Sequence, residues 1–344
     1  MTKKKVVVTD WEYADLRYEK EILDHEDIDL IPAQCKTEED VIEIAKDADG
    51  LINQYAPISQ RVLDRLERCQ IITRYGVGVN TIDIEAATEK EICVANVPDY
   101  CKDEVADHAL ALLMAWTRKV IVANHYVKNK VWDFKVTQPI YRLRGKVLGL
   151  VGFGMIPQSL AEKVKPLGLQ VVAHDPFVPE SVAKDKGVRL VTLEELCQQS
   201  DFLSVHAPLL ASTTGMIGRD QFAKMKETAI LINTSRGPVV DEQALIEALQ
   251  TKKIAGAALD VVEEEPIPSD HPFLDMEQVI LTPHVAWYSE ESARELRYKA
   301  AMGVMDVLVH KELPRYLVNR KVIPKKELKP SQAEERYKKL VRRE

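Results

Sequence analysis

The sequence KVLGLVGFGMIP, residues 146–157, decides the fold of this 344-residue chain. Its aliphatic run 147–151 predicts a buried strand, and the amphipathic pattern from Gln158 to Leu167 predicts a helix. Between them, Gly152 and Gly154 allow a tight turn in which the backbone can approach a pyrophosphate, whose charge the N–H groups at the helix start would meet. Strand, glycine turn and helix in this order indicate a dinucleotide-binding βαβ unit.

The ribose-binding position of this unit is filled by Asp175, which ends the next predicted strand and lies 21 residues after Gly154. A carboxylate there accepts hydrogen bonds from the ribose hydroxyls and repels the 2′-phosphate of NADP, so we expect NAD as the cofactor. The third glycine of the usual fingerprint is replaced by Pro157, whose missing N–H is not needed in a first helical turn. A structural turn in a domain that binds no nucleotide is the alternative interpretation.

Short apolar runs alternate with amphipathic stretches along most of the chain, which predicts parallel sheets covered by helices on both faces. The strands expected in a first sheet are 5–9, 50–52, 71–74 and 93–96. Those expected in a second sheet are 146–151, 170–173, 202–206, 229–233, 255–260 and 279–282. The sequence therefore predicts an α/β protein with two doubly wound parallel-sheet domains.

The order of these runs predicts an inserted domain. A long helical pattern covers residues 103–117, and a second runs from Ser289 to about His310. We expect a Rossmann NAD-binding domain over residues 101–289, inserted in a flavodoxin-like substrate domain formed by residues 1–100 and 290–344. The polar, basic stretch from Lys321 onward is expected to be a solvated C-terminal extension.

Composition limits the possible partners and the cellular location. The net charge of −7 disfavours nucleic acid or an anionic membrane surface as the main partner. Since the sequence shows no run of about 18 apolar residues and no signal-peptide pattern, we expect a cytoplasmic protein. The 5 cysteines are scattered without a Cys-x-x-Cys pair, which suits a reducing compartment and predicts no metal site.

Three polar segments of the second domain each follow a predicted strand, at the edge where open α/β sheets bind ligands. They contain Arg236, Glu265 and His284. The guanidinium of Arg236 suits a substrate carboxylate, His284 can donate and recover a proton, and Glu265 can orient the imidazole and stabilise its protonated form. Each alone has an ordinary structural explanation: a strand-end arginine, a packed histidine and a solvated acidic loop. Their shared position predicts a catalytic set that reduces a 2-oxo acid with NADH.

With these motifs in place, the chain resembles the D-isomer-specific 2-hydroxyacid dehydrogenases up to about residue 320. The resemblance rests on the glycine loop at Gly152 and on the stretches RYGVGVNTID (74–83), HAPL (206–209), NTSRG (233–237), Asp260, Glu265-Pro266 and TPH (282–284). It implies the catalytic roles given above and a homodimer formed through the cofactor domain. The family more usually has Asp-Asn-x-Asp where this chain has residues 80–83 (NTID), which puts the detail of that loop in doubt.

The resemblance also implies further ligand-binding residues. The backbone amides of Val77 and Gly78 would hold the substrate carboxylate together with Arg236, and His284 would also contact the substrate. Asp260 would bind the nicotinamide carboxamide. The remaining cofactor contacts are expected from Gly152, Gly154, Met155, Ile156, Asp175, His206, Pro208, Thr213, Thr234, Ser235 and Trp287.

Two functions stay open within this family. The stretch HVAWYS (284–289) is most similar to the C-terminal-binding-protein branch, so an NAD(H)-sensing co-repressor or scaffold is the alternative to a dehydrogenase. The missing low-complexity extensions favour the enzyme. Trp287 either narrows the substrate pocket or packs beside it.

The substrate is also left open among small 2-oxo acids. Formate oxidation is disfavoured because Glu265, and not a neutral Gln, partners the histidine. Phosphoglycerate is disfavoured because residues 53–58, after the second predicted strand, contain no Arg or Lys. Glyoxylate, hydroxypyruvate, a branched 2-oxo acid and a phosphorylated acid all remain possible.

Overall fold

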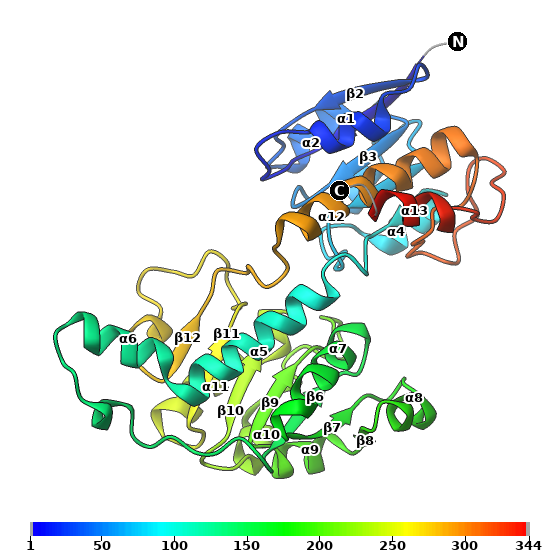
Figure 1. Cartoon of the computed structure of the whole chain (residues 1–344). Coiled ribbons are helices and arrows are strands. Elements are labelled where there is room, and N and C mark those ends of the chain that lie inside the picture. Colours follow the sequence, from blue (N-terminus) through cyan, green and yellow to red (C-terminus); the bar gives the residue numbers. More distant parts are fainter. Residues whose placement is uncertain (1–2, 342–344) are drawn as a thin grey trace. The chain divides into compact units, whose positions relative to one another are not determined.

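The computed structural model describes residues 3–341, and the chain divides into two compact units. Unit 1 consists of Met1–Tyr100 and Ser289–Glu344, and unit 2 of Cys101–Tyr288. The chain therefore leaves unit 1 once and returns to it. In Figure 1 the orange helix α12 (Glu290–Met305) and the red helix α13 (Glu334–Val341) lie among the blue and cyan elements of unit 1.

Unit 1 contains a parallel sheet of five strands in the order β2-β1-β3-β4-β5. This is the flavodoxin-like order, in which the chain winds outward in both directions from β1 and β3. The strands are β1 (Lys4–Val8), β2 (Ile28–Pro32), β3 (Gly50–Asn53), β4 (Ile71–Arg74) and β5 (Cys93–Ala95).

Helices cover both faces of this sheet. On one face, apolar residues of β1, β3, β4 and β5 form a buried cluster with α2, α3 and α4. On the other, α12 packs against β3 and β4, and α1 packs against α12. The bounds of the remaining helices of unit 1 are α1 (Arg17–Leu23), α2 (Glu38–Ala45), α3 (Gln60–Leu63) and α4 (Ile84–Glu89).

Unit 2 contains a parallel sheet of seven strands in the order β12-β11-β10-β9-β6-β7-β8. Counted from β6, this is the Rossmann order with one strand added at the β12 edge. The strands are β6 (Val147–Val151), β7 (Gln170–His174), β8 (Arg189–Leu190), β9 (Phe202–Val205), β10 (Ile230–Asn233), β11 (Gly256–Leu259) and β12 (Val279–Leu281).

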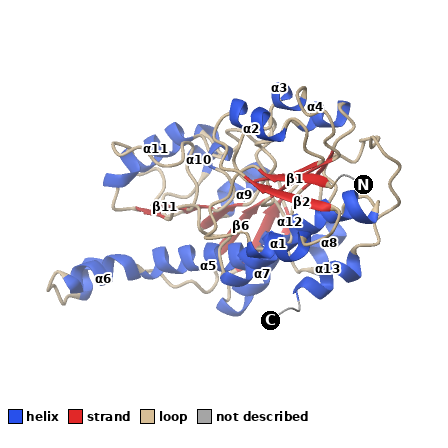
Figure 2. Ribbon diagram, turned by 90° about the horizontal axis from the view of Figure 1, so that it is seen from above, coloured by secondary structure: helices blue, strands red, loops and turns tan. Residues whose placement is uncertain are grey.

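Two buried clusters, one on each face, hold this sheet between its helices. One joins the strands to α5, α7 and α8, and the other joins them to α9, α10 and α11. Figure 2 shows α5 and α7 on the side of the strands opposite α10 and α11. The helices are α5 (Lys102–Arg118), α6 (Val120–Lys128), α7 (Met155–Val164), α8 (Glu180–Asp185), α9 (Leu193–Gln199), α10 (Arg219–Lys224) and α11 (Glu242–Gln250).

The structure adds elements that the sequence pattern did not predict. β2 is an edge strand with only one buried residue, Ile28, and β8 is two residues long, so neither produces a clear apolar run. The tail beyond Lys321 is also not simply solvated, because α13 buries Tyr337 and Arg336 forms ion pairs with Asp306 and Glu312. Within residues 3–341, no helix has the length and apolar character that crossing a membrane requires.

Candidate active site

The turn after β6 is built around Gly152. This residue has a φ of +90°, and a Cβ placed on it would lie 3.1 Å from the backbone nitrogen of Ala207, in the loop after β9. A side chain here would be both strained and crowded. Because β6 lies between β9 and β7, this is the position where the strand order reverses and where doubly wound sheets bind their ligands.

Helix α7 begins directly after this turn. Gly154 is its N-cap, and a Cβ on Gly154 would meet no atom within 4 Å, so the helix start faces open space. The N–H groups of Met155 and Ile156 lie in the first turn, where a helix has no internal acceptor for them. Pro157 is buried in the same turn, which explains how a proline fits where the fingerprint has glycine.

Asp175 follows β7 and is fixed by three backbone donors. One carboxylate oxygen accepts a hydrogen bond from Phe153 N at 2.8 Å, and the other accepts from Phe177 N at 2.9 Å and Val178 N at 3.2 Å. The carboxylate is thereby tied to the glycine turn, as an acceptor for ribose hydroxyls would be. Its contact with the ribose remains a prediction.

The loop after β9 carries His206 in a neutral form. Burial lowers the pKa of His206 to about 3, and its Nε2 lies 2.8 Å from Ser204 Oγ. This ring therefore offers a neutral contact surface and no acid–base chemistry near neutral pH. Further along, the Thr213 hydroxyl donates to Pro208 O at 2.6 Å and accepts from Leu210 N at 2.8 Å, which closes the loop.

The segment after β10 is held by Asn233. Its side-chain oxygen accepts from Ser235 N at 3.0 Å, and its amide donates to Arg236 O at 3.0 Å. Thr234, between them, has a buried Oγ1 with no hydrogen-bond partner among the described residues. A buried hydroxyl without a partner is costly in a folded protein, which indicates that a ligand supplies one.

The loops after β10 and β11 touch at Gly237. A Cβ on this residue would lie 1.9 Å from Val262 O, so only glycine allows the approach. Val262 N in turn donates to one carboxylate oxygen of Glu265 at 3.2 Å. Arg236 is close enough for its charge to help lower the pKa of Glu265. The backbone thus brings two of the three predicted catalytic residues together.

His284 completes this group. Its Nδ1 lies 2.7 Å from the second carboxylate oxygen of Glu265, and the two side chains are 38% and 37% exposed. Burial alone would raise the pKa of Glu265, but the His284 hydrogen bond and charge, with Val262 N and Arg236, hold that pKa below its ordinary value. The His284 Nε2 has no hydrogen-bond partner among residues 3–341, so one ring nitrogen is oriented and the other is available.

Asp260 fixes the backbone that presents His284. The residue is 2% exposed, and its carboxylate accepts from the Thr282 hydroxyl at 2.5 Å, Val285 N at 3.0 Å and Ala286 N at 2.9 Å. Asp260 thus positions this turn, a role that the sequence did not indicate. Its predicted contact with a nicotinamide carboxamide stays a prediction. His284 itself has a φ of +52°.

One residue at this turn was missed by the sequence analysis. His108 of α5 lies 3.0 Å from Thr282 Oγ1 and 3.5 Å from a carboxylate oxygen of Asp260. It is 174 positions from Thr282, and no local pattern marks it. Trp287 packs edge-on against Tyr288, with 5.5 Å between ring centroids, and its place in the substrate pocket is not tested by this contact.

Unit 1 contains the predicted carboxylate-binding loop after β4. Gly76 has a φ of +129°, and a Cβ there would lie 2.1 Å from the Arg74 guanidinium. Asn96 donates to Val77 O at 2.6 Å, whereas the N–H groups of Val77 and Gly78 have no partner among the described residues. Two unpartnered amides in one turn are suited to an anion, and their contact with substrate stays a prediction.

The residues present in unit 2 fit a dinucleotide. They comprise open space at the start of α7, the tethered carboxylate of Asp175, the neutral ring of His206 and the unpartnered hydroxyl of Thr234. All four lie in the loops that follow β6, β7, β9 and β10, at one edge of the sheet. This arrangement is typical of NAD-binding Rossmann domains.

Comparison with known proteins gives the same result for unit 2. Residues 110–286 match the family model described as "D-isomer specific 2-hydroxyacid dehydrogenase, NAD binding domain". Unit 2 is therefore an NAD-binding domain, and the predicted cofactor is confirmed.

Named relatives extend the similarity to most of the chain. The D-3-phosphoglycerate dehydrogenase of Methanocaldococcus jannaschii is 41% identical over 294 residues, 85% of this chain. The glyoxylate reductase of Korarchaeum cryptofilum is 40% identical over 310 residues, 88% of this chain and 92% of that enzyme. The match covers only 56% of the phosphoglycerate dehydrogenase, so the chain spans about half the length of that relative. These relatives do not support the co-repressor alternative, and the C-terminal-binding-protein branch remains untested.

A solved structure agrees in fold. The D-lactate dehydrogenase of Aquifex aeolicus, in complex with NAD and lactic acid, superposes with a TM-score of 0.79 at 27% identity, over 88% of this chain and 95% of that one. Two parallel-sheet units, the family match and the relatives thus converge, and the chain belongs to the D-isomer specific 2-hydroxyacid dehydrogenase family.

Proposed function

We propose that this protein is an NAD-dependent dehydrogenase that interconverts a 2-oxo acid and a D-2-hydroxy acid. The observation that carries the proposal is the 2.7 Å contact between Glu265 and His284 Nδ1, which leaves the other ring nitrogen, Nε2, without a partner in the described chain. A carboxylate that orients one ring nitrogen while the other handles a proton is the arrangement that general acid–base chemistry needs.

The residues of unit 2 divide the work between them. Protonated His284 gives the proton on Nε2 to the carbonyl oxygen in reduction, and takes it back in oxidation. Glu265 fixes the ring and balances the imidazolium charge, while the Arg236 guanidinium binds the substrate carboxylate. When bound, the cofactor would supply the hydride as NADH in reduction and accept it as NAD⁺ in oxidation. The N–H groups of Val77 and Gly78 are the proposed contribution of unit 1 to carboxylate binding.

We propose a short, unphosphorylated 2-oxo acid as the substrate. The loop after β3 lies against carboxylates: Asp10 accepts from Gln54 N at 3.1 Å and Tyr55 N at 2.6 Å, and the Tyr55 hydroxyl lies 3.1 Å from Glu12. Arg74 Nε also donates to Gln54 O at 3.3 Å, but the two carboxylates outnumber this one cation and disfavour a phosphate ester next to the loop. The relative named glyoxylate reductase, matched over 92% of its length, supports the same class of substrate, and the relative named D-3-phosphoglycerate dehydrogenase, which would favour a phosphorylated acid, is matched over only 56% of its length.

NADH oxidation with a panel of 2-oxo acids tests this proposal. We expect turnover with glyoxylate or hydroxypyruvate, and a kcat/KM for 3-phosphohydroxypyruvate at least ~10-fold lower. The same assays with NADPH should be slower, because Asp175 would repel a 2′-phosphate. If no 2-oxo acid is reduced although NADH binds, the enzymatic proposal is wrong, and a preference for 3-phosphohydroxypyruvate contradicts only the substrate assignment.

We also propose a homodimer formed through unit 2. The segment that begins with α6 exposes a run of apolar side chains, and α6 buries none of its own residues. Its most exposed members are Val120 at 52%, Ile121 at 51%, Trp132 at 89%, Phe134 at 71% and Tyr141 at 58%. An exposed apolar segment of this size is typical of a protein–protein interface.

Light scattering coupled to gel filtration tests the dimer. The wild type is expected to have twice the mass of one chain, and the double variant Trp132→Glu/Phe134→Glu to have the mass of one. Phe177→Glu is the matched control, since Phe177 is 87% exposed in the same unit but lies outside this segment. Wild-type protein with the mass of a single chain contradicts the proposal.

We further propose a cytoplasmic location. All five cysteines are buried, and no disulfide joins any of them in the described chain. Buried thiols of this kind suit a reducing compartment. Localisation of a tagged chain by microscopy would test this, and a signal outside the cytoplasm would contradict it.

A further inference from the structure

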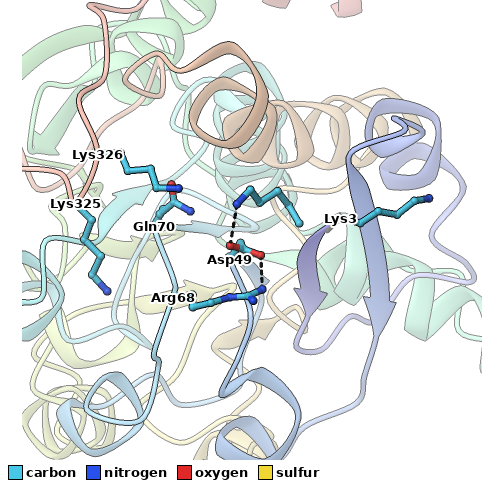
Figure 3. Close-up of a pocket in the computed structure, with 7 residues that line it drawn as sticks. Lys3, Asp49, Arg68, Gln70, Lys325 and Lys326 are labelled. Carbon is cyan, nitrogen blue, oxygen red and sulfur yellow. Dashed lines mark hydrogen bonds and ion pairs between the residues drawn. The ribbon is translucent and has the colours of Figure 1, made fainter. Parts of the chain in front are cut away.

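A basic pocket lies at the amino-terminal edge of the unit 1 sheet. Its volume is about 280 Å³, and Figure 3 shows the side chains that form it. The lining residues are Lys3, Lys4, Asp49, Arg68, Gln70, Lys325 and Lys326.

The position of the pocket separates it from the predicted substrate loop. Lys4 begins β1, while Asp49 and Gln70 directly precede β3 and β4. The loop with Val77 and Gly78 follows the other end of β4. Because the strands are parallel, the pocket and that loop lie at opposite edges of the sheet. The proposed dehydrogenase chemistry therefore does not use these residues.

The cations of the pocket outnumber its acids. Its single carboxylate, Asp49, is 3% exposed and is already engaged with Arg68 at 2.8 Å, Lys4 at 3.5 Å and Lys5 N at 3.0 Å. The two dashed lines at Asp49 in Figure 3 mark its contacts with Arg68 and Lys4. Asp49 thus holds two cations in place but has little capacity left for others.

Two further lysines of the pocket, Lys325 and Lys326, add to its positive charge. Among residues 3–341, no carboxylate forms an ion pair with Lys325 or Lys326, and Figure 3 shows the Lys326 ammonium on the same side of Asp49 as Gln70, whereas Lys3 extends away. At nearby Lys311, burial lowers the pKa most, the charges of Lys326 and Lys4 lower it further, and the carboxylates of Asp27 and Asp49 offset part of this effect. Cations that repel one another across a concave surface favour an anion between them.

Gln70 provides a second, independent indication. It is 6% exposed, and its main chain is fully engaged through Gln70 N to Asp49 O at 2.9 Å and Cys93 N to Gln70 O at 3.0 Å. Its side-chain amide lines the pocket and has no hydrogen-bond partner among the described residues. Because this amide faces the pocket and can reach solvent there, it is free to donate a hydrogen bond to a bound ligand.

We propose that this pocket binds a small anion of the phosphate class with several negative charges, such as pyrophosphate or the polyphosphate chain of a nucleotide. Arg68, Lys4, Lys325 and Lys326 supply the charge, and the Gln70 amide donates a directional hydrogen bond to a phosphate oxygen. The small volume and the amide that lines the pocket fit a small ligand better than a macromolecule, whose phosphates would contact only the rim. The site is independent of the proposed enzymatic activity.

Isothermal titration calorimetry of the full chain with pyrophosphate tests the site. NADH is added to saturation first, so that the pyrophosphate-binding turn at Gly152 cannot account for the signal. We expect one binding event per chain that weakens as NaCl is raised, because exposed charge interactions are screened. The double variant Lys325→Ala/Lys326→Ala should bind at least ~10-fold more weakly, and Gln70→Leu about 3-fold more weakly.

The matched control is Lys20→Ala/Lys36→Ala. It removes the same charge from exposed positions of unit 1 that have no ion pair in the described chain, and it should bind pyrophosphate like the wild type. Circular dichroism checks that every variant is folded. ATP binding more tightly than tripolyphosphate would assign the ligand to nucleotides, and equal affinity would assign it to the bare phosphate chain.

Two results would overturn the proposal. The first is the absence of pyrophosphate binding to the NADH-saturated wild type. The second is equal affinity in the wild type and in folded Lys325→Ala/Lys326→Ala, which would place the anion elsewhere. Because the readout is binding and not turnover, failure here leaves the dehydrogenase proposal untouched.

Discussion

Unit 2 contains two His–Glu pairs that look alike and are used differently. Glu265 lies 2.7 Å from His284, and Glu242 lies 2.9 Å from His271. In the first pair the side chains are 38% and 37% exposed, and in the second they are 12% and 16% exposed. Distance alone therefore does not distinguish the proposed catalytic pair from the other.

The unused hydrogen-bonding capacity does distinguish them. Both ring nitrogens of His271 are engaged, Nε2 with Glu242 and Nδ1 with Phe273 N at 3.2 Å. The second oxygen of Glu242 accepts from Glu263 N at 2.9 Å. His284 uses only Nδ1, and its other nitrogen has no partner in the described chain. A structural pair is saturated within the protein, whereas a catalytic pair keeps one atom for the substrate.

The largest effect is expected from His284→Asn. Asparagine tolerates the φ of +52° at this position but cannot act as a general acid near neutral pH. We expect kcat to fall on the order of 10²–10⁴-fold with a panel substrate, while NADH affinity by fluorescence titration changes little. Near-normal turnover in this variant would remove His284 from the mechanism.

Glu265→Gln should have the next largest effect. The amide oxygen can still orient the ring but cannot balance the imidazolium charge, so we expect kcat to fall on the order of 10–100-fold. Because the folded-state pKa of Glu265 is lowered, its charge is present at neutral pH and is lost only as the pH falls through that lowered pKa, below the ordinary 4.5.

The pH profile therefore provides a second measurement. Between about pH 5.5 and 8 the wild-type Glu265 carboxylate stays charged. The Glu265→Gln variant lacks this charge, so its reduction rate should begin to fall at a lower pH than that of the wild type as the pH is raised. An identical profile in both proteins would mean that the charge of Glu265 does not act on the imidazolium and that the residue only orients the ring.

His271→Ala should lower stability and leave turnover nearly unchanged, the opposite of the effects expected at His284 and Glu265. Loss of the ring leaves Glu242 and Phe273 N with unsatisfied hydrogen-bonding groups, so we expect the free energy of unfolding to fall by about 2–3 kcal/mol. The kcat of the remaining folded protein should stay within about 2-fold of wild type, since no catalytic step is assigned to this pair. Urea unfolding and turnover, measured on the same sample, separate the two quantities.

Local sequence pattern was enough to predict most of the proposed site. Arg236, Glu265 and His284 each follow a strand of the same parallel sheet, and parallel strands end at one edge, so their proximity follows from the order of the elements. The glycines at 152 and 237 agree with this, because backbone crowding requires them.

Contacts between distant parts of the chain could not be predicted in the same way. The His108 contact with Thr282 spans 174 positions, and the saturation of His271 depends on Glu242, 29 positions away. The sequence alone shows only that His108 and His271 each lie next to an acidic residue. Which nitrogen stays available depends on through-space packing, which periodicity does not encode.

The C-terminal tail is the clearest case, because its basic composition predicted a solvated extension. Instead, the buried Tyr337 hydroxyl donates to Asp306 at 3.0 Å, and Arg336 contacts the same carboxylate at 3.0 Å. Burial raises the pKa of Asp306 to about 6, although Arg336 and Tyr337 each lower it. A carboxyl with a raised folded-state pKa stabilises most below its ordinary pKa, and this contribution declines as the pH rises through about 6.

Tyr337→Phe should therefore have the smallest effect of the series, and one that depends on pH. At pH 7.5 Asp306 is ionised, and loss of its hydrogen bond should lower the free energy of unfolding by about 1–2 kcal/mol. At pH 5 the carboxyl is mostly protonated and the loss should be below about 1 kcal/mol, since a neutral pair is weaker. Urea unfolding at both pH values checks this. An equal loss at the two would show that the Tyr337 hydroxyl stabilises the fold independently of the charge on Asp306, and would contradict the proposed role of that charge in holding the tail.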